Sequence, residues 1–210
     1  MTTGAPQPTV FVVDDDPSFR RAVSRLLRAA GHQVRAFASA SELVESLPVT
    51  GPGCVVADLQ MPGLNGLELQ AALAGSDNPL PVLFLTGHGD IPTSVHAMRL
   101  GAEDFLTKRA PKEALLDAVN RALARDARER AGRARVQEAR ARFDALTERE
   151  REVLEHVLRG QLNKQIAGDL GIHERTVKLH RTAITTKVGV QSVAELSQLW
   201  MEAFPKGHLP

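Results

Sequence analysis

The stretch Cys54-Val55-Val56-Ala57-Asp58-Leu59-Gln60-Met61-Pro62-Gly63 decides the fold of this chain. Its first four residues are apolar and rich in β-branched side chains, a pattern typical of a short buried strand. The strand runs directly into the carboxylate of Asp58, and the Met-Pro-Gly that follows turns the chain. Open α/β sheets place their ligand sites at the C-terminal ends of strands, so Asp58 is a candidate functional residue. The alternative is that Asp58 caps a loop or the next helix.

Further apolar segments alternate with helical patterns on both sides of this stretch. Strands are predicted at residues 10–13, 34–37, 54–57, 81–85 and 104–107. Helices are predicted after the caps Asp16 and Ser39, after Asn65-Gly66 over 67–73, over 91–100, and from Pro111. Strict alternation of apolar strands with helices predicts an α/β doubly wound fold with a five-stranded parallel sheet.

Composition limits the class of protein. The 210 residues are 43% hydrophobic with a net charge of +1, which is enough apolar material for one or two domains. The charge is uneven: −4 over residues 1–120, +4 over 121–145 and +1 over 146–210. One cysteine, Cys54, excludes an intramolecular disulfide and a cysteine-rich zinc site. The first nine residues lack the pattern of a secretion signal, and no apolar run approaches ~18 residues, so we expect a cytoplasmic protein without a membrane span.

Polar side chains follow four of the predicted strands: Asp14, Asp15, Asp58, Thr86 and Lys108. The strands are parallel, so all of these side chains should converge on one edge of the sheet. A cluster of carboxylates without His or Cys favours a hard cation, most simply Mg²⁺. One carboxylate could then act as nucleophile toward a phosphoryl group, with Lys108 and Thr86 supplying donors to its oxygens. The sequence contains no glycine-rich nucleotide-binding loop.

Residues 9–124 resemble a response-regulator receiver domain, which has a flavodoxin-like fold. The resemblance rests on Val13-Asp14-Asp15-Asp16-Pro17, on Asp58 to Gly63, on Leu85-Thr86-Gly87-His88-Gly89, and on the run from Gly101 to Lys108. It implies that Asp58 accepts phosphate from a sensor histidine kinase, and that Mg²⁺ is bound by Asp14, Asp15, Asp58 and the backbone carbonyl of Gln60. It also implies that Thr86 and Lys108 contact the phosphoryl group. Phe105 matches the family's aromatic switch, or is a plain core residue.

One departure from the family pattern follows the lysine. The family usually has Lys-Pro-Phe with a cis bond before the proline, whereas this chain has Lys108-Arg109-Ala110. A cis bond before a residue other than proline costs about 3 kcal/mol. Either the loop after Lys108 is therefore trans and rearranged, or the strain is tolerated.

Residues 125–143 have a different composition, dominated by Arg, Ala and Glu and without proline. Ala and Arg are strong helix formers, so the preceding helix is predicted to continue through about Arg142 as a helical linker. Its apolar stripe is thin, which favours a solvated helix or a partly flexible linker over a dedicated coiled coil. The excess of arginine would also attract DNA without sequence preference.

A second, all-helical unit is predicted after the linker. Thr147 and Glu150 form a capping-box pattern before a helix over 148–158, Asn163 is predicted to cap 164–170, and Ser192 to cap a last helix through Trp200. Gly171 separates the second helix from a third over 174–187, as in a helix-turn-helix. The third helix carries basic and hydroxyl side chains outward, which is typical of a major-groove recognition helix. The alternative is an ordinary amphipathic surface helix.

Residues 146–199 resemble the LuxR-type helix-turn-helix, through Leu146 to Leu154, Asn163 to Ala167 and Thr176 to Arg181. The resemblance places base-reading positions at Lys178, Leu179 and Thr182, and phosphate contacts at Lys164, Thr176, His180, Arg181 and Lys187. With the receiver it implies a two-component response regulator of FixJ/NarL type, divided into 1–124 (receiver), 125–143 (linker) and 144–210 (DNA-binding).

The resulting prediction is a phosphorylation-dependent transcription regulator, not an enzyme. Its expected partners are a sensor histidine kinase, promoter DNA, a second copy of the chain on phosphorylation, and RNA polymerase. One alternative is a LuxR-type regulator that works without phosphorylation, for example by sensing a small ligand. Another is a Mg²⁺-dependent aspartyl-phosphate hydrolase, which would use the same acidic cluster but would turn over free phosphomonoesters.

Overall fold

The computed structural model describes residues 7–48, 51–76, 78–87 and 91–205. The chain forms two compact units, Met1–Arg130 and Ala131–Pro210. Each unit has its own core: clusters on the two faces of a sheet in the first, and a helical cluster in the second. None of the helices in the described ranges combines the length and apolar composition needed to span a membrane.

The first unit contains the predicted parallel sheet. Its strands lie in the order β2-β1-β3-β4-β5, which is the flavodoxin-like order. The bounds are β1 Thr9–Val13, β2 Gln33–Phe37, β3 Gly53–Ala57, β4 Val82–Thr86 and β5 Asp104–Thr107. Val13 pairs with Ala57, and Thr86 pairs with Thr107, so the polar residues that follow these strands leave the sheet at one edge. All five strands agree with the prediction within one residue at each end.

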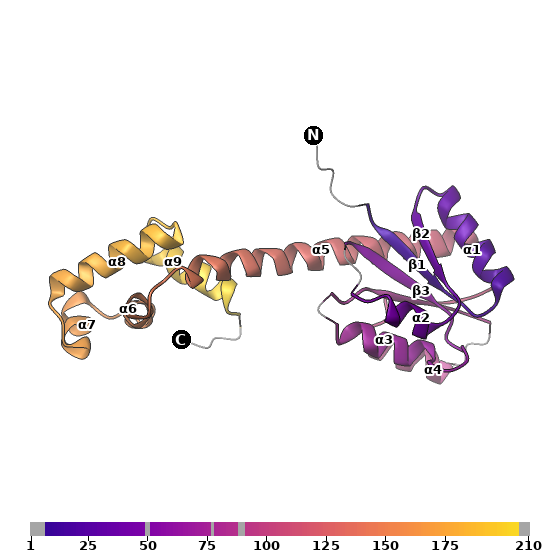
Figure 1. The fold of residues 1–210 in the computed structure, drawn as a ribbon, viewed down its shortest axis with the longest axis horizontal. Helices are drawn as coiled ribbons and strands as arrows, with labels where there is room; N and C mark the ends of the chain where they lie inside the picture. The colour runs from indigo at the N-terminus through magenta and orange to yellow at the C-terminus, as the bar shows by residue number, and fades with distance from the viewer. Residues whose placement is uncertain (1–6, 49–50, 77, 88–90, 206–210) are drawn as a thin grey trace. The chain divides into compact units, whose positions relative to one another are not determined.

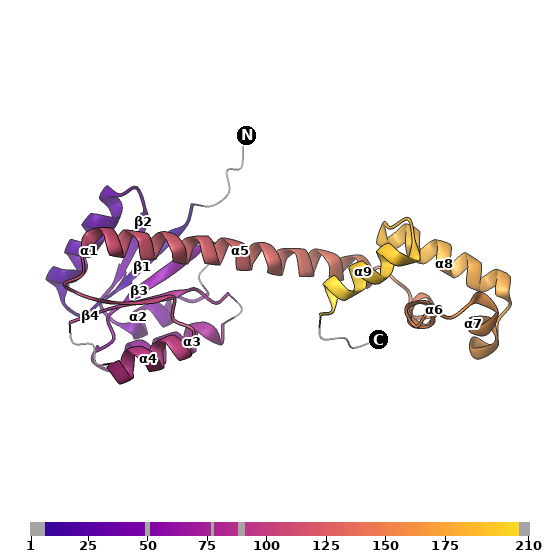
Figure 2. The same cartoon turned by 180° about the vertical axis from the view of Figure 1, so that it is seen from behind.

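Helices cover both faces of this sheet (Figures 1 and 2). Alternate residues of β1 show why, because Phe11 and Val13 belong to one core cluster while Val10 and Val12 belong to the other. The first cluster packs against α2 Ala40–Glu45, α3 Gly66–Ala74 and α4 Ile91–Arg99; the second packs against α1 Pro17–Ala29 and the start of α5 Lys112–Asp144. Cys54 of the central strand β3 is completely buried in the second cluster, and burial raises the pKa of its thiol.

The predicted helix caps in this unit are confirmed. Asp16 accepts hydrogen bonds from the backbone N–H groups of Ser18 and Phe19 at the start of α1, and Ser39 accepts one from Glu42 in α2. Asn65 and Glu68 form a reciprocal capping box that starts α3. These caps determine where the chain turns from each strand end into the next helix.

Helix α5 is one continuous helix of 33 residues, as the composition of the linker predicts, and it extends two residues beyond Arg142 to Asp144. Its N-terminal part buries Leu115, Ala118, Val119 and Ala122 against the sheet. Asp126, fully buried, accepts hydrogen bonds from the backbone N–H of Gly53 and from Nε of Arg130, both at 2.8 Å. The division between the two units falls within this helix, after Arg130.

Four further helices lie in the second unit: α6 Glu148–Leu158, α7 Asn163–Leu170, α8 Glu174–Val188 and α9 Val193–Ala203. Val153, Ile166, Val177, Ile184 and Leu196 form their shared core, which Phe143 and Trp200 join with rings 5.1 Å apart. The predicted capping box at Thr147 and the cap at Ser192 are confirmed. Gly171 ends α7 with a left-handed φ of 63°, which makes the turn into α8.

One predicted cap is wrong. Asn163 is the first residue of α7 rather than its cap, because the capping position is Leu162, which has no side-chain acceptor. Gln165 compensates in part, since its side-chain oxygen accepts a 2.8 Å hydrogen bond from the backbone N–H of Leu162. Helices α8 and α9 also end one and three residues later than predicted, at Val188 and Ala203.

Candidate functional site: an acidic sheet edge and a helix-turn-helix

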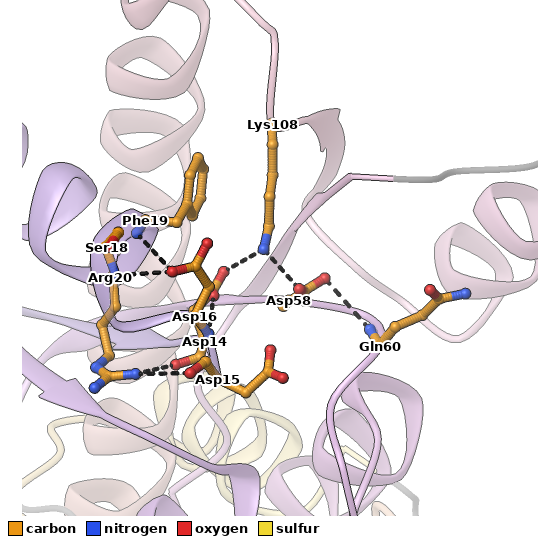
Figure 3. Close-up of polar contacts among 9 residues, drawn as sticks. All are labelled: Asp14, Asp15, Asp16, Ser18, Phe19, Arg20, Asp58, Gln60 and Lys108. Carbon is orange, nitrogen blue, oxygen red and sulfur yellow. Dashed lines mark hydrogen bonds and ion pairs between the residues drawn. The ribbon is translucent and has the colours of Figure 1, made fainter.

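The end of β1 places two carboxylates beside each other. The backbone N–H of Asp14 donates to the carbonyl of Phe37 at 3.3 Å, and Oδ1 of Asp14 accepts from the N–H of Asp16 at 2.9 Å. Asp14 is buried and Asp15 is exposed. The guanidinium of Arg20, from the first turns of α1, donates to the carbonyl of Asp14 at 2.6 Å and to that of Asp15 at 3.4 Å (Figure 3).

The end of β3 brings Asp58 to the same edge. Its backbone N–H donates to the carbonyl of Val13 at 2.8 Å, and its Oδ1 accepts from the N–H of Gln60 at 3.3 Å. Gly66, at the start of α3, packs closely against this turn. A Cβ added to Gly66 would lie 2.6 Å from the carbonyl oxygen of Asp58 and 2.8 Å from the ring of Phe84, so only glycine fits there.

Lys108 connects these two carboxylates. Its backbone N–H donates to the carbonyl of Thr86 at 2.7 Å, which fixes the residue at the end of the β4–β5 pair. Its Nζ lies 2.7 Å from Oδ2 of Asp14 and 2.7 Å from Oδ2 of Asp58, as Figure 3 shows. The ammonium also lies 4.5 Å from the centre of the Phe19 ring, close enough for a cation–π interaction.

The loop after Lys108 answers the question raised by the missing proline. Among the described residues the only cis peptide bond is Leu47–Pro48, so the bond between Lys108 and Arg109 is trans. The N–H of Ala110 donates to the carbonyl of Thr107 at 2.9 Å and closes a turn. The Lys108 ammonium therefore reaches the acidic edge without a cis bond.

The acidic cluster suits a divalent cation. Oxygen atoms of Asp14, Asp15 and Asp58 all lie within 4.8 Å of one another. Burial raises the pKa of Asp14, against the lowering effect of Lys108. Burial would lower the pKa of Lys108, but its hydrogen bonds to Asp14 and Asp58 raise it instead. The cluster of three carboxylates therefore has one paired ammonium, which contacts two of them, and a donor set made of oxygen alone fits Mg²⁺.

There is room beside the cluster. A cavity of about 590 Å³ is lined by Asp15, Gln60, Met61, Asn65 and Thr93, among others. Gln60 therefore lines the cavity together with Asp15, and its backbone N–H contacts Asp58. The structure thus brings together Asp14, Asp15, Asp58 and Lys108, with Gln60 beside them.

The two predicted switch positions, Thr86 and Phe105, lie on neighbouring strands. Thr86 is the last residue of β4 and is buried. Phe105 is half-buried on β5, and its ring centre lies 6.2 Å from that of Phe84 in the core. Phe105 therefore packs at the margin of the core rather than inside it. Thr86 belongs to the motif from Leu85 to Gly89, and two residues of that motif, His88 and Gly89, lie outside the described residues.

In the second unit, α8 presents a mixed surface. Lys178, Leu179 and Thr182 are exposed, and Leu179 keeps 64% of its surface in solvent although it is a large apolar residue. Thr176, His180 and Arg181 are half-buried, and Lys164 is exposed on α7. Lys178 Nζ lies 3.7 Å from Glu174, one turn earlier. The buried side of α8 consists of Val177, Ile184 and Val188.

Lys187 differs from the other predicted DNA contacts. Its Nζ lies 2.7 Å from Oε2 of Glu150, which is only 5% exposed. Burial would raise the pKa of Glu150, but the hydrogen bonds from Lys187 and Thr147 lower it. Lys187 thus already has a structural partner that joins the end of α8 to the start of α6.

Sequence reasoning missed several residues that support the site. Arg20 holds the backbone of Asp14 and Asp15, Phe19 lies under the lysine, and Glu150 pairs with Lys187. The spacing of Phe19 and Arg20 after the cap Asp16 was a usable signal, since it puts both in the first turn of a helix that starts at the acidic edge. The pair Glu150–Lys187 is separated by 37 positions and left no local signal.

Comparison with known proteins supports both units. Residues 10–120 match the model of the response regulator receiver domain, and residues 144–200 match that of the bacterial regulatory proteins of the luxR family. Nodulation protein W of Bradyrhizobium diazoefficiens is 41% identical over 198 residues, covering 94% of this chain and 87% of that protein. Transcriptional regulatory protein FixJ of the same organism is 38% identical over 194 residues, covering 92% and 95%.

The solved structure of the response regulator StyR is similar over nearly the whole chain. It superposes with a TM-score of 0.82 at 46% identity, covering 94% of this chain and 100% of that one. Both halves of the chain, in this order, therefore occur together in these relatives. The chain belongs to the two-component response regulators that join a receiver domain to a LuxR-type DNA-binding domain.

Proposed function

We propose that Asp58 receives a phosphoryl group from a phosphohistidine of a sensor kinase, and that this event controls binding of the second unit to promoter DNA. The observation that carries the proposal is the position of Asp58. Its carboxylate lies at a rigid strand end, 2.7 Å from the Lys108 ammonium and within a cluster suited to a divalent cation. In the transfer, an oxygen of Asp58 forms the new bond to phosphorus while the bond to the histidine nitrogen breaks.

Asp14, Asp15, Asp58 and the carbonyl of Gln60 would hold Mg²⁺, which when bound offsets negative charge on the phosphoryl oxygens. Lys108 keeps Asp14 and Asp58 oriented and then donates to a phosphoryl oxygen. Thr86 supplies a hydroxyl donor from the neighbouring strand end. Arg20 fixes the backbone that carries the two β1 carboxylates.

The response is proposed to pass through Thr86 and Phe105 to the surface made by α4, β5 and α5. Helix α4 carries Val95 and Met98 with 42% and 46% of their surface in solvent, and Leu100, directly after the helix, keeps 50%. These apolar side chains are a reasonable basis for pairing with a second copy of the chain, because dimer interfaces are richer in apolar surface than the remaining exterior. Phosphorylation would shift the receiver between two states that differ at this surface.

The second unit would insert α8 into the major groove. Lys178, Leu179 and Thr182, all exposed on α8, would meet base edges, with Leu179 suited to a thymine methyl group. Lys164, Thr176, His180 and Arg181 are placed to contact phosphates, and Lys187 would share its charge between DNA and Glu150. A two-fold dimer would bind a pseudo-palindromic site and from there contact RNA polymerase.

The test compares wild type with Asp58→Ala in the presence of acetyl phosphate and Mg²⁺. We expect an increase in dimer fraction and in promoter affinity for wild type alone, measured by sedimentation and by fluorescence anisotropy. Equal affinity and equal dimer fraction in both proteins would identify a regulator that works without phosphorylation. Catalytic hydrolysis of a free phosphomonoester by wild type would instead favour a hydrolase.

The recognition surface is tested by Lys178→Ala. We expect specific binding to weaken by roughly 1–3 kcal/mol, with a smaller loss on unrelated DNA. An equal loss on both DNAs would reassign Lys178 to a phosphate contact.

A further inference from the structure

Helix α1 carries an unusual concentration of positive charge. It contains Arg20, Arg21, Arg25 and Arg28, and no acidic residue. None of these four guanidiniums lies within ion-pair distance of a carboxylate among the residues that the structure describes. Three arginines of α5 differ, since Arg121, Arg125 and Arg130 are each paired with an acid. The charge of α1 is therefore uncompensated within an otherwise acidic unit.

These arginines line a hollow. A surface cavity of about 610 Å³ lies along α1 and reaches Ala36 of the edge strand β2, next to which α1 lies in Figure 1. Its polar lining is Ser18, Arg20, Arg21, Ser24, Arg25 and Arg28. Arg21, Arg25 and Arg28 follow each other at spacings of four and three residues, so they form one stripe of the helix.

A buried hydroxyl borders the same cavity. Ser24 is 2% exposed, and its Oγ has no hydrogen-bond partner among the described residues. A buried polar group without a partner destabilises the fold, so such a group is a candidate for contact with a ligand. The cavity thus offers several guanidinium groups and one free hydroxyl from a single rigid helix.

From this lining we infer that the cavity binds a small phosphate-bearing anion, of the class of organic diphosphates and triphosphates. Guanidinium groups match phosphate oxygens with paired hydrogen bonds, and the Ser24 hydroxyl supplies a further donor. The volume is within the range of small-molecule sites. The cavity is separate from the acidic edge, where an anion would meet Asp14 and Asp58. It shares only Arg20 with that edge, because Arg20 also donates to the carbonyls of Asp14 and Asp15.

The test uses inorganic tripolyphosphate as probe, titrated calorimetrically into the full chain with EDTA present so that no divalent cation links the probe to the acidic edge. We expect Arg21→Ala combined with Arg25→Ala to weaken binding by tenfold or more, since two sets of charge-assisted hydrogen bonds to the probe would be lost. Ser24→Ala should weaken it severalfold. Arg99→Ala, which removes an exposed arginine of α4, is the matched control and should change nothing.

Hydrogen exchange locates the site independently of affinity. Binding should slow exchange over residues 17–36, and unchanged circular dichroism should show that the variants are folded. The inference is overturned if the double variant binds as well as wild type, or if protection appears only on α7 and α8. It is equally overturned if sulfate at the same ionic strength displaces all of the bound tripolyphosphate, because the binding would then be only nonspecific attraction between the arginines and anions.

Discussion

Lys108 is the residue on which the acidic edge depends in the absence of a cation. Its ammonium contacts Asp14 and Asp58 at 2.7 Å each, and only 18% of the side chain is exposed. Because the charged groups of Lys108, Asp14 and Asp58 are largely buried, they interact more strongly than ion pairs at the protein surface do. Lys108 therefore offsets the repulsion between the carboxylates of Asp14 and Asp58, and under the proposed function it would turn to the phosphoryl group.

Arg20 is a positioning residue for the same edge, and its replacement tests this. Arg20→Ala removes hydrogen bonds to the carbonyls of Asp14 and Asp15, so the two carboxylates should lose their fixed spacing. We expect roughly tenfold weaker Mg²⁺ binding, from the loss of about 1–1.5 kcal/mol of ordering. Calorimetry measures the affinity, and intact-mass spectrometry measures phosphorylation by acetyl phosphate.

The matched control is Arg21→Ala, which removes the same charge from the next position but no contact to these carbonyls. If both variants lose Mg²⁺ affinity equally, the effect of Arg20 is only its charge. If neither does, the Asp14–Asp15 turn is held by other contacts, such as the hydrogen bond from the Asp16 N–H to Asp14.

The positions of single residues could be predicted from the sequence wherever a residue follows or ends a strand. Asp14, Asp58, Thr86 and Lys108 each follow or end a parallel strand, and parallel strands share one edge. The prediction failed where side chains meet from separate elements. Glu150 of α6 and Lys187 of α8 are 37 positions apart, and no local pattern encodes their contact.

At the scale of elements, α6 and α8 are joined by the pair Glu150–Lys187. Replacing Glu150 with Gln keeps an acceptor for the capping box but removes the ion pair. We expect the second unit to lose about 1–3 kcal/mol, because Lys187 and a buried amide are left poorly paired. Denaturant unfolding followed by Trp200 fluorescence measures this, since Trp200 is the only tryptophan and there is no tyrosine.

The same pair predicts a pH dependence. The pKa of Glu150 is lowered in the folded chain from its ordinary 4.5, so its contribution to stability is complete above that value. It is lost as the pH falls from about 4.5 through the lower folded pKa. Wild type should therefore lose stability over this range more steeply than Glu150→Gln. Parallel curves for the two proteins would show that the pair contributes nothing.

Helix α5 contains one glycine, Gly132, just beyond the division between the units. A Cβ at this position would meet no atom within 4 Å, so alanine fits without strain. Gly132→Ala should stabilise the helix by about 0.5–1 kcal/mol and slow hydrogen exchange around it. If the regulatory response uses bending at this glycine, the same variant should reduce the effect of phosphorylation on DNA affinity; Gly132→Ser is an intermediate control.

The elements themselves were largely predictable because their ends carry chemical signals. Asp16, Ser39, Thr147 and Ser192 cap helices as expected, since each offers a side-chain oxygen to free N–H groups. Asn65, expected only at the entry to α3, caps that helix in the same way. The predicted cap of α7 was wrong, because Asn163 has a side chain typical of a cap but is the first residue of the helix. The length of α5 was predictable from its Ala and Arg content alone.

At the scale of the whole molecule, the two units have separate cores, so ligand binding should stabilise them separately. Mg²⁺ at 100 times its dissociation constant should stabilise the first unit by about 2.7 kcal/mol. The unfolding midpoint of the second unit, reported by Trp200 fluorescence, should not change. The midpoint of the first unit, followed by circular dichroism, should move to a higher denaturant concentration. Asp15→Asn should abolish the shift. Movement of both transitions together would show that the units unfold as one.

The buried thiol of Cys54 has a practical consequence. It is the only cysteine, it lies in the central strand with no exposed surface, and burial raises its pKa. Alkylating reagents attack the exposed thiolate, so iodoacetamide should modify the native protein only during openings that expose the sheet. The rate of carboxamidomethylation then reports how often the folded receiver opens, and the measurement needs neither an engineered label nor a denaturant.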